Sequence, residues 1–179
     1  MQRFLVILAL VASLLGAQTA AADLVNNGGF ETNDFTGWTK SGNDTYTYVT
    51  SYYGNVHSGT YAVQSGPYDT RVFLSETLPT IAGKSYKISL WLANDAGGSV
   101  SNPNRFTVDW GGINSCDLNN LAAQAYTKYQ FTVVATGAST VLTLGLQNNL
   151  SFFSLDDVSV NAVPGAVPIP PIVLLLFEE

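Results

Sequence analysis

Residues 84–93 read KSYKISLWLA, and an apolar side chain stands at every second position. The apolar members of this run are Tyr86, Ile88, Leu90 and Leu92. Side chains of a β-strand alternate between its two faces, so this spacing predicts a strand with one face in a hydrophobic core.

The same alternation recurs along the chain, and short clusters rich in Gly, Asn, Ser and Pro separate the runs. The further runs cover residues 45–53, 61–64, 71–77, 105–110, 129–133, 141–147 and 152–160. Short strands at such regular spacing predict an all-β fold, a two-sheet antiparallel β-sandwich of the jelly-roll type. Residues 117–125 alone are compatible with a short helix, placed in a connection.

The first 22 residues have the pattern of a secretory signal peptide. Arg3 precedes an apolar run over residues 4–15, and three alanines at positions 20–22 form a small-residue cleavage site. The apolar run is too short for a membrane-spanning helix. We therefore expect a signal peptide at 1–22 and an exported mature chain that begins at Asp23. The alternative is a buried N-terminal helix.

Composition restricts the function of the remaining domain, residues 23–161. The chain has 13 acidic and 7 basic residues and a net charge of -6. Without a basic patch, we expect no binding to nucleic acid. Cys116 is the only cysteine, so no intrachain disulfide stabilises this exported domain.

Two adjacent carboxylates, Asp156 and Asp157, interrupt the last predicted strand. By alternation, Asp156 shares a face with Val158 and Val160, which directs one carboxylate toward the core. A buried carboxylate without a partner costs several kcal/mol, so it requires a cation, an arginine or several N–H donors. Near the other end of the domain, Glu31 ends the glycine-rich segment NNGGFE, residues 26–31.

Calcium binds six to eight oxygen atoms and combines carboxylates with backbone carbonyls. We therefore predict a structural Ca²⁺ ion held by Glu31, Asp156 and Asp157, with carbonyl oxygens of the turn at Ser58 and Gly59. The alternative is that Glu31 accepts N–H groups of a turn and the Asp pair caps a strand end.

Five segments in order resemble the galactose-binding-like jelly rolls, which include carbohydrate-binding modules of the family 4/9 type. These segments are NGGFE (27–31), FTGW (35–38), HSGTYAV (57–63), YKISLW (86–91) and LDDVSV (155–160). The resemblance implies a two-sheet sandwich, a structural calcium ion near the chain ends, and a sugar site on one face or at the loop tips. Together with the alternation, it places Trp38 and Trp91 in the core.

Sugar sites stack aromatic faces on sugar rings and surround them with polar groups. Tyr46, Tyr48 and Tyr52 fall on one face of a polar predicted strand, and Trp110 precedes a Gly-Gly turn. We predict these four side chains as the substrate-binding residues for a polysaccharide or glycan. The alternative is that the tyrosines are structural, because sheets favour aromatic residues wherever they lie.

The sequence favours a binding protein over an enzyme. His57 is the only histidine and lies in a predicted turn, and the chain has no Gly-x-Ser-x-Gly or His-Glu-x-x-His motif. We expect a non-catalytic carbohydrate-binding or exopolysaccharide-associated surface protein. The alternatives are a structural or adhesive envelope protein without sugar binding and a glycoside hydrolase, which needs only two carboxylates.

Residues 162–179 form a proline-rich linker and a short apolar tail. The VPIP segment at 167–170 resembles the sorting signals of the PEP-CTERM type, which implies a secreted or cell-envelope protein of a Gram-negative bacterium and a transient contact with the membrane or with sorting machinery. This chain departs from the pattern, because the apolar run at 172–177 is too short to span and two glutamates follow it. The alternative is a disordered tail.

Overall fold

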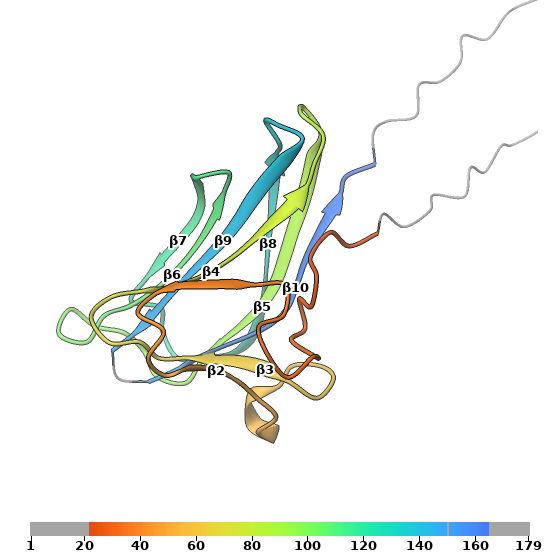
Figure 1. The fold of residues 1–179 in the computed structure, drawn as a ribbon. Helices are drawn as coiled ribbons and strands as arrows, with labels where there is room; N and C mark the ends of the chain where they lie inside the picture. Colours follow the sequence, from red (N-terminus) through yellow and green to blue (C-terminus); the bar gives the residue numbers. More distant parts are fainter. Residues whose placement is uncertain (1–21, 150, 165–179) are drawn as a thin grey trace, which may run out of the picture.

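The computed structural model describes residues 22–149 and 151–164. In these residues ten strands form two five-stranded antiparallel sheets that pack face to face (Figure 1). The first sheet has the order β1-β4-β9-β6-β7 and the second the order β2-β3-β10-β5-β8. The strands are β1 (Thr39–Gly42), β2 (Thr47–Thr50), β3 (Ala62–Ser65), β4 (Val72–Pro79), β5 (Ser85–Asn94), β6 (Asn104–Trp110), β7 (Ile113–Asn119), β8 (Gln124–Val134), β9 (Ser139–Asn148) and β10 (Phe153–Ala162). The predicted all-β sandwich is confirmed.

The core lies between the sheets and consists of the apolar positions of the alternating runs. In β5, Ile88 and Leu90 are fully buried, whereas Lys87 is exposed and Ser89 is half-buried. Burial of one such aliphatic side chain contributes about 1.5–3 kcal/mol. The inward side chains of β4, β6 and β9 meet those of β5 and β10 in one contiguous cluster.

The segment before β1 closes one side of the sandwich. Phe30 is fully buried and stacks on Trp38 at a centroid distance of 5.8 Å. The backbone of this segment also pairs with β10, since Leu24 N–H donates to Val160 O and Val158 N–H donates to Gly28 O, each at 2.9 Å. The prediction of a core position for Trp38 is therefore confirmed, and the beginning of the domain lies against its last strand.

Several sequence predictions need correction. Residues 117–125 form no helix, because they belong to the end of β7, the start of β8 and the connection between them. The helical turn of the described residues is instead a short 3-10 turn, η1 (Tyr53–Asn55), which begins at the last residue of the run predicted as a strand over 45–53. Strands β1 and β7 were not predicted. They are mostly polar strands at the edges of the first sheet, without the alternation that reveals the others.

Strand β10 ends at Ala162, and Val163 N–H still donates to Ser85 O, so the predicted domain boundary at residue 161 stays a prediction. The predicted signal peptide and most of the tail lie outside the described residues. Among the described residues, no helix combines the length and the apolar character that crossing a membrane requires.

Candidate functional site

A bulge in β10 separates the two adjacent aspartates. Asp156 pairs with Trp91 of β5, and the register between the two strands then shifts before Ser159. Asp157 has a positive φ of 49°. Because Leu155 points into the core, Asp156 points to the outer face of the second sheet, and the bulge returns Val158 to the core. The predicted common face of Asp156 and Val158 is therefore wrong.

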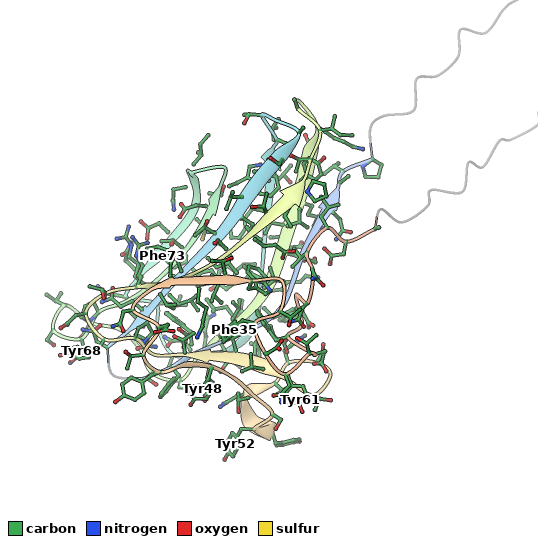
Figure 2. All side chains as sticks on the ribbon, viewed as in Figure 1. Phe35, Tyr48, Tyr52, Tyr61, Tyr68 and Phe73 are labelled. Atoms are coloured by element: carbon green, nitrogen blue, oxygen red, sulfur yellow. The ribbon has the colours of Figure 1, made fainter. Side chains whose placement is uncertain are left out.

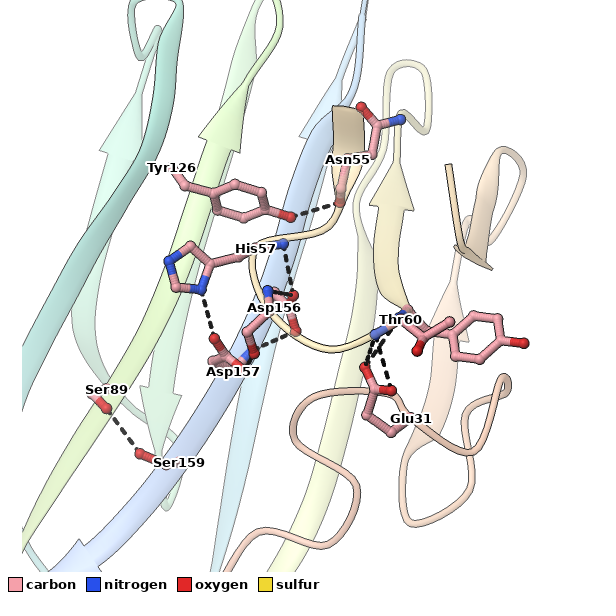
Figure 3. Close-up of polar contacts among 11 residues, drawn as sticks. Glu31, Asn55, His57, Thr60, Ser89, Tyr126, Asp156, Asp157 and Ser159 are labelled. Carbon is pink, nitrogen blue, oxygen red and sulfur yellow. Dashed lines mark hydrogen bonds and ion pairs between the residues drawn. The ribbon is translucent and has the colours of Figure 1, made fainter. Parts of the chain in front are cut away.

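Asp156 is nevertheless 0% exposed, because a loop covers it. Its Oδ2 accepts the backbone N–H groups of His57 at 3.0 Å and Ser58 at 3.1 Å, and its Oδ1 accepts the N–H of Asp157 at 2.7 Å (Figure 3). Burial raises the pKa of Asp156 to about 6, although these donors oppose the shift. The carboxylate thus fixes the loop around residues 57–58 on the sheet.

Glu31 fixes the next part of the same loop. Its Oε1 accepts the N–H groups of Thr60 at 2.9 Å and Tyr61 at 3.0 Å (Figure 3). A Cβ atom at Gly59 would lie 2.3 Å from Glu31 Oε1, so this approach requires glycine. These contacts match the alternative interpretation in which Glu31 accepts the N–H groups of a turn.

The predicted calcium ligands approach one another at Gly29. A Cβ atom there would lie 3.7 Å from Asp157 Oδ1 and 3.9 Å from Asp156 Oδ1, and 3.7 Å from Cγ of Glu31. Within the described ranges, however, no three His, Cys, Asp or Glu side chains are arranged to hold a metal. Two aspartate oxygens thus face the same space, while the Glu31 carboxylate points to Thr60. The calcium site stays a prediction.

His57 joins the aspartates to an aromatic cluster on the outer face of the second sheet. Its Nδ1 lies 2.6 Å from Asp157 Oδ2, and its ring stacks on Trp91 at 3.9 Å between centroids. The Tyr126 hydroxyl donates to Asn55 O at 2.8 Å (Figure 3), and burial raises the pKa of Tyr126. Trp91 is therefore half-buried beneath the loop, and its predicted core position is wrong.

This cluster lacks the geometry of a serine nucleophile. Ser58 Oγ donates to Asp157 Oδ1 at 2.7 Å, and His57 contacts the other oxygen of the same carboxylate. A catalytic histidine must instead lie between the hydroxyl and the carboxylate. The arrangement of Ser58, His57 and Asp157 holds a loop in place and provides no base for Ser58.

The predicted sugar-binding residues divide into three accessible tyrosines and one buried tryptophan. Tyr46, Tyr48 and Tyr52 are 62%, 43% and 71% exposed. They do not share one strand face, because Tyr46 has a φ of 59° before β2 begins and Tyr52 follows the strand. Trp110 is only 4% exposed and its Nε1 donates to Val134 O at 3.0 Å. A buried indole cannot stack on a sugar from solvent, so Trp110 is corrected to a core residue.

The first sheet carries a groove that the sequence analysis missed. Its outer face shows a row of mainly small or polar side chains across five strands, in which each residue pairs with the next: Ser41, Phe73, Gly145, Thr107 and Asp117. Beside this row lies a cavity of about 650 Å³, lined by Gly42, Asn43, Asp69, Thr70, Arg71, Phe73 and Gln147. Its volume falls in the range of ligand pockets. Figure 2 shows Phe73 well apart from Tyr52.

Phe73 and Arg71 give the groove its chemistry. The Arg71 guanidinium lies 5.0 Å from the centroid of the Phe73 ring, and its Nη1 donates to Thr107 Oγ1 at 3.0 Å. Gly145 leaves room for Thr107 and Phe73, since a Cβ atom there would lie 2.5 Å from Thr107 Oγ1 and 3.1 Å from Phe73 Cε1. The sequence did contain a signal for this groove. If Val72 and Leu74 face the core, alternation places the aromatic residue Phe73 on the opposite, polar face of the strand.

Solved structures with the same fold include carbohydrate-binding modules and an enzyme. TmCBM61 in complex with β-1,4-galactotriose has a TM-score of 0.63 at 20% identity, over 80% of this chain and 100% of that one. The CBM22-1 xylan-binding domain of Xyn10C from Paenibacillus barcinonensis has a TM-score of 0.59 at 21% identity, over 84% and 100%. A cyclase from Fischerella sp. TAU, in complex with 4-(1H-indol-3-yl)butan-2-one, has a TM-score of 0.59 at 17% identity, over 82% and 100%.

At these low sequence identities, the similarity to the solved structures establishes only the fold. This fold is the β-sandwich that carbohydrate-binding modules also have. No family model matches the chain, and neither does any curated protein. The resemblance to sorting signals of the PEP-CTERM type is not addressed by these comparisons and stays a prediction.

Proposed function

We propose that this chain is a non-catalytic carbohydrate-binding protein and that the sugar binds in the groove of the first sheet. The observation that carries the proposal is the half-buried Phe73 ring on an open face otherwise built from polar side chains. Arg71, Asn43 and Gln147 supply hydrogen-bond donors around it. An aromatic ring among such donors is the combination that sugar rings require, because their C–H faces are apolar and their hydroxyls are polar.

The fold supports the same class of function. TmCBM61 binds β-1,4-galactotriose and the CBM22-1 domain is xylan-binding, and both share this sandwich over their full length. We infer that the ligand here is also a polysaccharide or oligosaccharide. Fold likeness does not select the sugar, so galactan and xylan serve as the first probes.

The test is retardation of the mature domain in native gels that contain galactan or xylan. The wild-type protein is expected to be retarded by at least one of them, and Phe73→Ala to lose most of this retardation. Tyr53→Ala is the matched control, because Tyr53 is an exposed aromatic residue on η1, outside the groove. Equal retardation of wild type and Phe73→Ala would exclude the groove as the site.

The groove offers no pair of catalytic carboxylates. Asp69 is the only acidic side chain among its lining residues, and its Oδ1 accepts a hydrogen bond from Asn149 Nδ2 at 3.3 Å. Glycoside hydrolysis needs two carboxylates that flank the bond. We therefore propose binding without cleavage. Release of reducing sugar from galactan or xylan would favour the hydrolase alternative, and a complete absence of retardation on a glycan panel would favour a structural or adhesive envelope protein.

We further propose the structural Ca²⁺ ion, held by Asp156 and Glu31 with Asp157 and with carbonyl oxygens of the turn. Three acidic side chains approach Gly29, and His57 is the only basic side chain that forms an ion pair with any of them in the described residues. A cation would relieve this concentration of negative charge. Calcium is expected to raise the melting temperature of the domain and a chelator to lower it, since the ion binds only the folded state. Asp156→Asn should abolish the response.

Export and association with exopolysaccharide complete the proposal. Asp23, the predicted first residue of the mature chain, accepts the N–H groups of Val25 and Val160 through its Oδ1. Cleavage after Ala22 therefore preserves these contacts. Mass spectrometry of the protein recovered from the medium and from the envelope fraction tests the cleavage site and the location together. A mature chain that begins well beyond Asp23 would contradict the proposal.

A further inference from the structure

We infer that the sugar-binding surface continues beyond the groove, over two loops that each carry an exposed tyrosine, so that the ligand is the interior of a long polysaccharide chain. This inference rests on the proposed function. The loops, here called the rim loops, are residues 43–46 and 66–70. Tyr46 belongs to the first rim loop and Tyr68 to the second, and both are more than half exposed.

The rim loops are part of the groove and not a separate surface. Asn43 and Asp69 line the groove, and Tyr68 directly precedes Asp69. The Asn43 Nδ2 group donates to Tyr68 O at 3.0 Å, which joins the two loops. Figure 2 shows Phe73, Tyr68 and Tyr48 in succession along the left and lower side of the view. A chain that leaves the groove past Asp69 therefore meets Tyr68 first.

Hydrogen bonds hold the backbone of both rim loops in place. Tyr46 O accepts the N–H of Gly66 at 3.0 Å, and Thr70 N–H donates to Tyr68 O at 2.8 Å. The second loop is also anchored to the end of β9, because Asp69 N–H donates to Asn149 Oδ1 at 3.1 Å. Loops whose backbone is already held in place lose little conformational entropy when a sugar binds to them.

The backbone of both loops enters the left-handed region beside the tyrosines. Tyr46 has a φ of 59°, which a bulky residue seldom adopts, and Asp69 has a φ of 63°, which aspartate tolerates better. Such conformations concentrate at ligand-binding sites, where the surrounding structure maintains them. A tyrosine at position 46 is unfavourable for the backbone and adds little to the core, because most of its side chain lies in solvent. Contact with a ligand accounts for both features.

The experiment compares a short and a long ligand of the same sugar: β-1,4-galactotriose with galactan, and xylotriose with xylan. Binding constants are measured for wild type, Phe73→Ala, Tyr68→Ala and Tyr46→Asn, since asparagine tolerates a positive φ. Tyr53→Ala serves as the control, and melting curves establish that each variant folds. Phe73→Ala is expected to weaken binding of both the short and the long ligand. Tyr68→Ala and Tyr46→Asn are each expected to weaken binding of the polymer about five-fold and binding of the trimer less than two-fold.

The outcomes separate this inference from the proposed function. One outcome is that Phe73→Ala weakens binding of both ligands while the rim-loop variants bind the polymer like wild type. The groove is then the binding site, and the proposed extension over the rim loops is overturned. Equal losses on trimer and polymer in the rim-loop variants would place the tyrosines in a short site and also overturn the extension. If Phe73→Ala binds normally, or if wild type binds none of the four ligands, the proposed groove fails and the extension fails with it.

Discussion

The outer faces of the two sheets differ in what covers them. On the first sheet, Phe73 lies beside an open groove among polar side chains. On the second sheet, Trp91 occupies a comparable position on an inner strand, but the loop around His57 lies on it, and the carboxylates of Asp156, Asp157 and Glu31 fix that loop. Both positions are half-buried aromatic residues on an outer face, and only one of them is left for a ligand.

This difference shows that an aromatic residue on a sheet face has two uses. A ring covered by the chain's own loop contributes to folding, whereas a ring beside an open groove contributes to binding. Substitutions on the second face should therefore change stability without changing the binding of sugar. Substitutions on the first face should change binding and leave stability close to that of wild type.

The largest expected effect on stability comes from Asp156→Ala. This change removes the buried acceptor of the N–H groups of His57 and Ser58, and a donor left unsatisfied away from water costs about 1–3 kcal/mol. We expect a loss of about 3 kcal/mol in the free energy of unfolding, measured by urea denaturation. The control is Thr77→Ala on the exposed side of β4, expected within about 0.5 kcal/mol of wild type. Similar midpoints for the two variants would show that the loop needs no carboxylate.

The direct test of the comparison is the pair Trp91→Ala and Phe73→Ala. Trp91→Ala removes the surface on which His57 stacks and should cost about 2 kcal/mol, below the value for a fully buried aromatic residue. Phe73→Ala should cost about 1 kcal/mol and abolish most of the polysaccharide retardation. Retardation and melting temperature are measured on both variants. If Trp91→Ala loses binding at unchanged stability, the roles of the two faces are reversed.

The alternation of the sequence predicted the strands of the core but not the surroundings of these aromatic residues. Period two predicts that Ile88 and Leu90 are buried, because they alternate with the polar residues Lys87 and Ser89. It cannot reveal the bulge at Asp157, which changes the side on which every preceding residue of β10 lies. Nor can it reveal that Asp156 is buried by a loop about 100 residues earlier in the chain.

The groove was missed for a related physical reason. Its lining comes from segments that adjoin three strands, and only the sheet order places Gln147 of β9 beside Phe73 of β4 and Asn43 after β1. Trp110 illustrates the opposite error. Its position before a Gly-Gly turn indicated exposure, but the carbonyl of Val134 satisfies its indole N–H within the core. Residue type and local spacing identified aromatic candidates, and tertiary contacts decided which of them are accessible.

The pH dependence of stability provides a smaller effect on the covered face. Burial raises the pKa of Asp156 to about 6, above its ordinary value of 3.8. The folded state therefore holds this proton more tightly than the unfolded state. The stabilisation is complete below pH 4 and is lost as the pH rises through 6. In calcium-free buffer we expect the free energy of unfolding to fall by about 2 kcal/mol over this window.

Glu76 and Asp95, whose pKa values burial also raises, titrate in the same direction. The measurement is therefore the difference between wild type and Asp156→Asn, by urea denaturation at pH 4.5, 5.5 and 6.5. The variant should lose the larger part of the pH dependence. Parallel curves for the two proteins would assign the dependence to the other carboxylates and contradict a titrating Asp156 beneath the loop.

The smallest effect is expected from truncation of the chain after Val163. Val163 N–H donates to Ser85 O at 2.9 Å, whereas Pro164 is exposed. A mature chain that ends at Val163 should therefore unfold within about 0.5 kcal/mol of one that continues to Glu179. A chain that ends at Ala162 should lose about 1 kcal/mol with that hydrogen bond.

Retardation by galactan or xylan should be the same for all three lengths, because the groove lies on strands β1, β4 and β9. A large loss of stability on truncation at Val163 would show that the tail is part of the folded domain, and a loss of retardation alone would assign it to the sugar site.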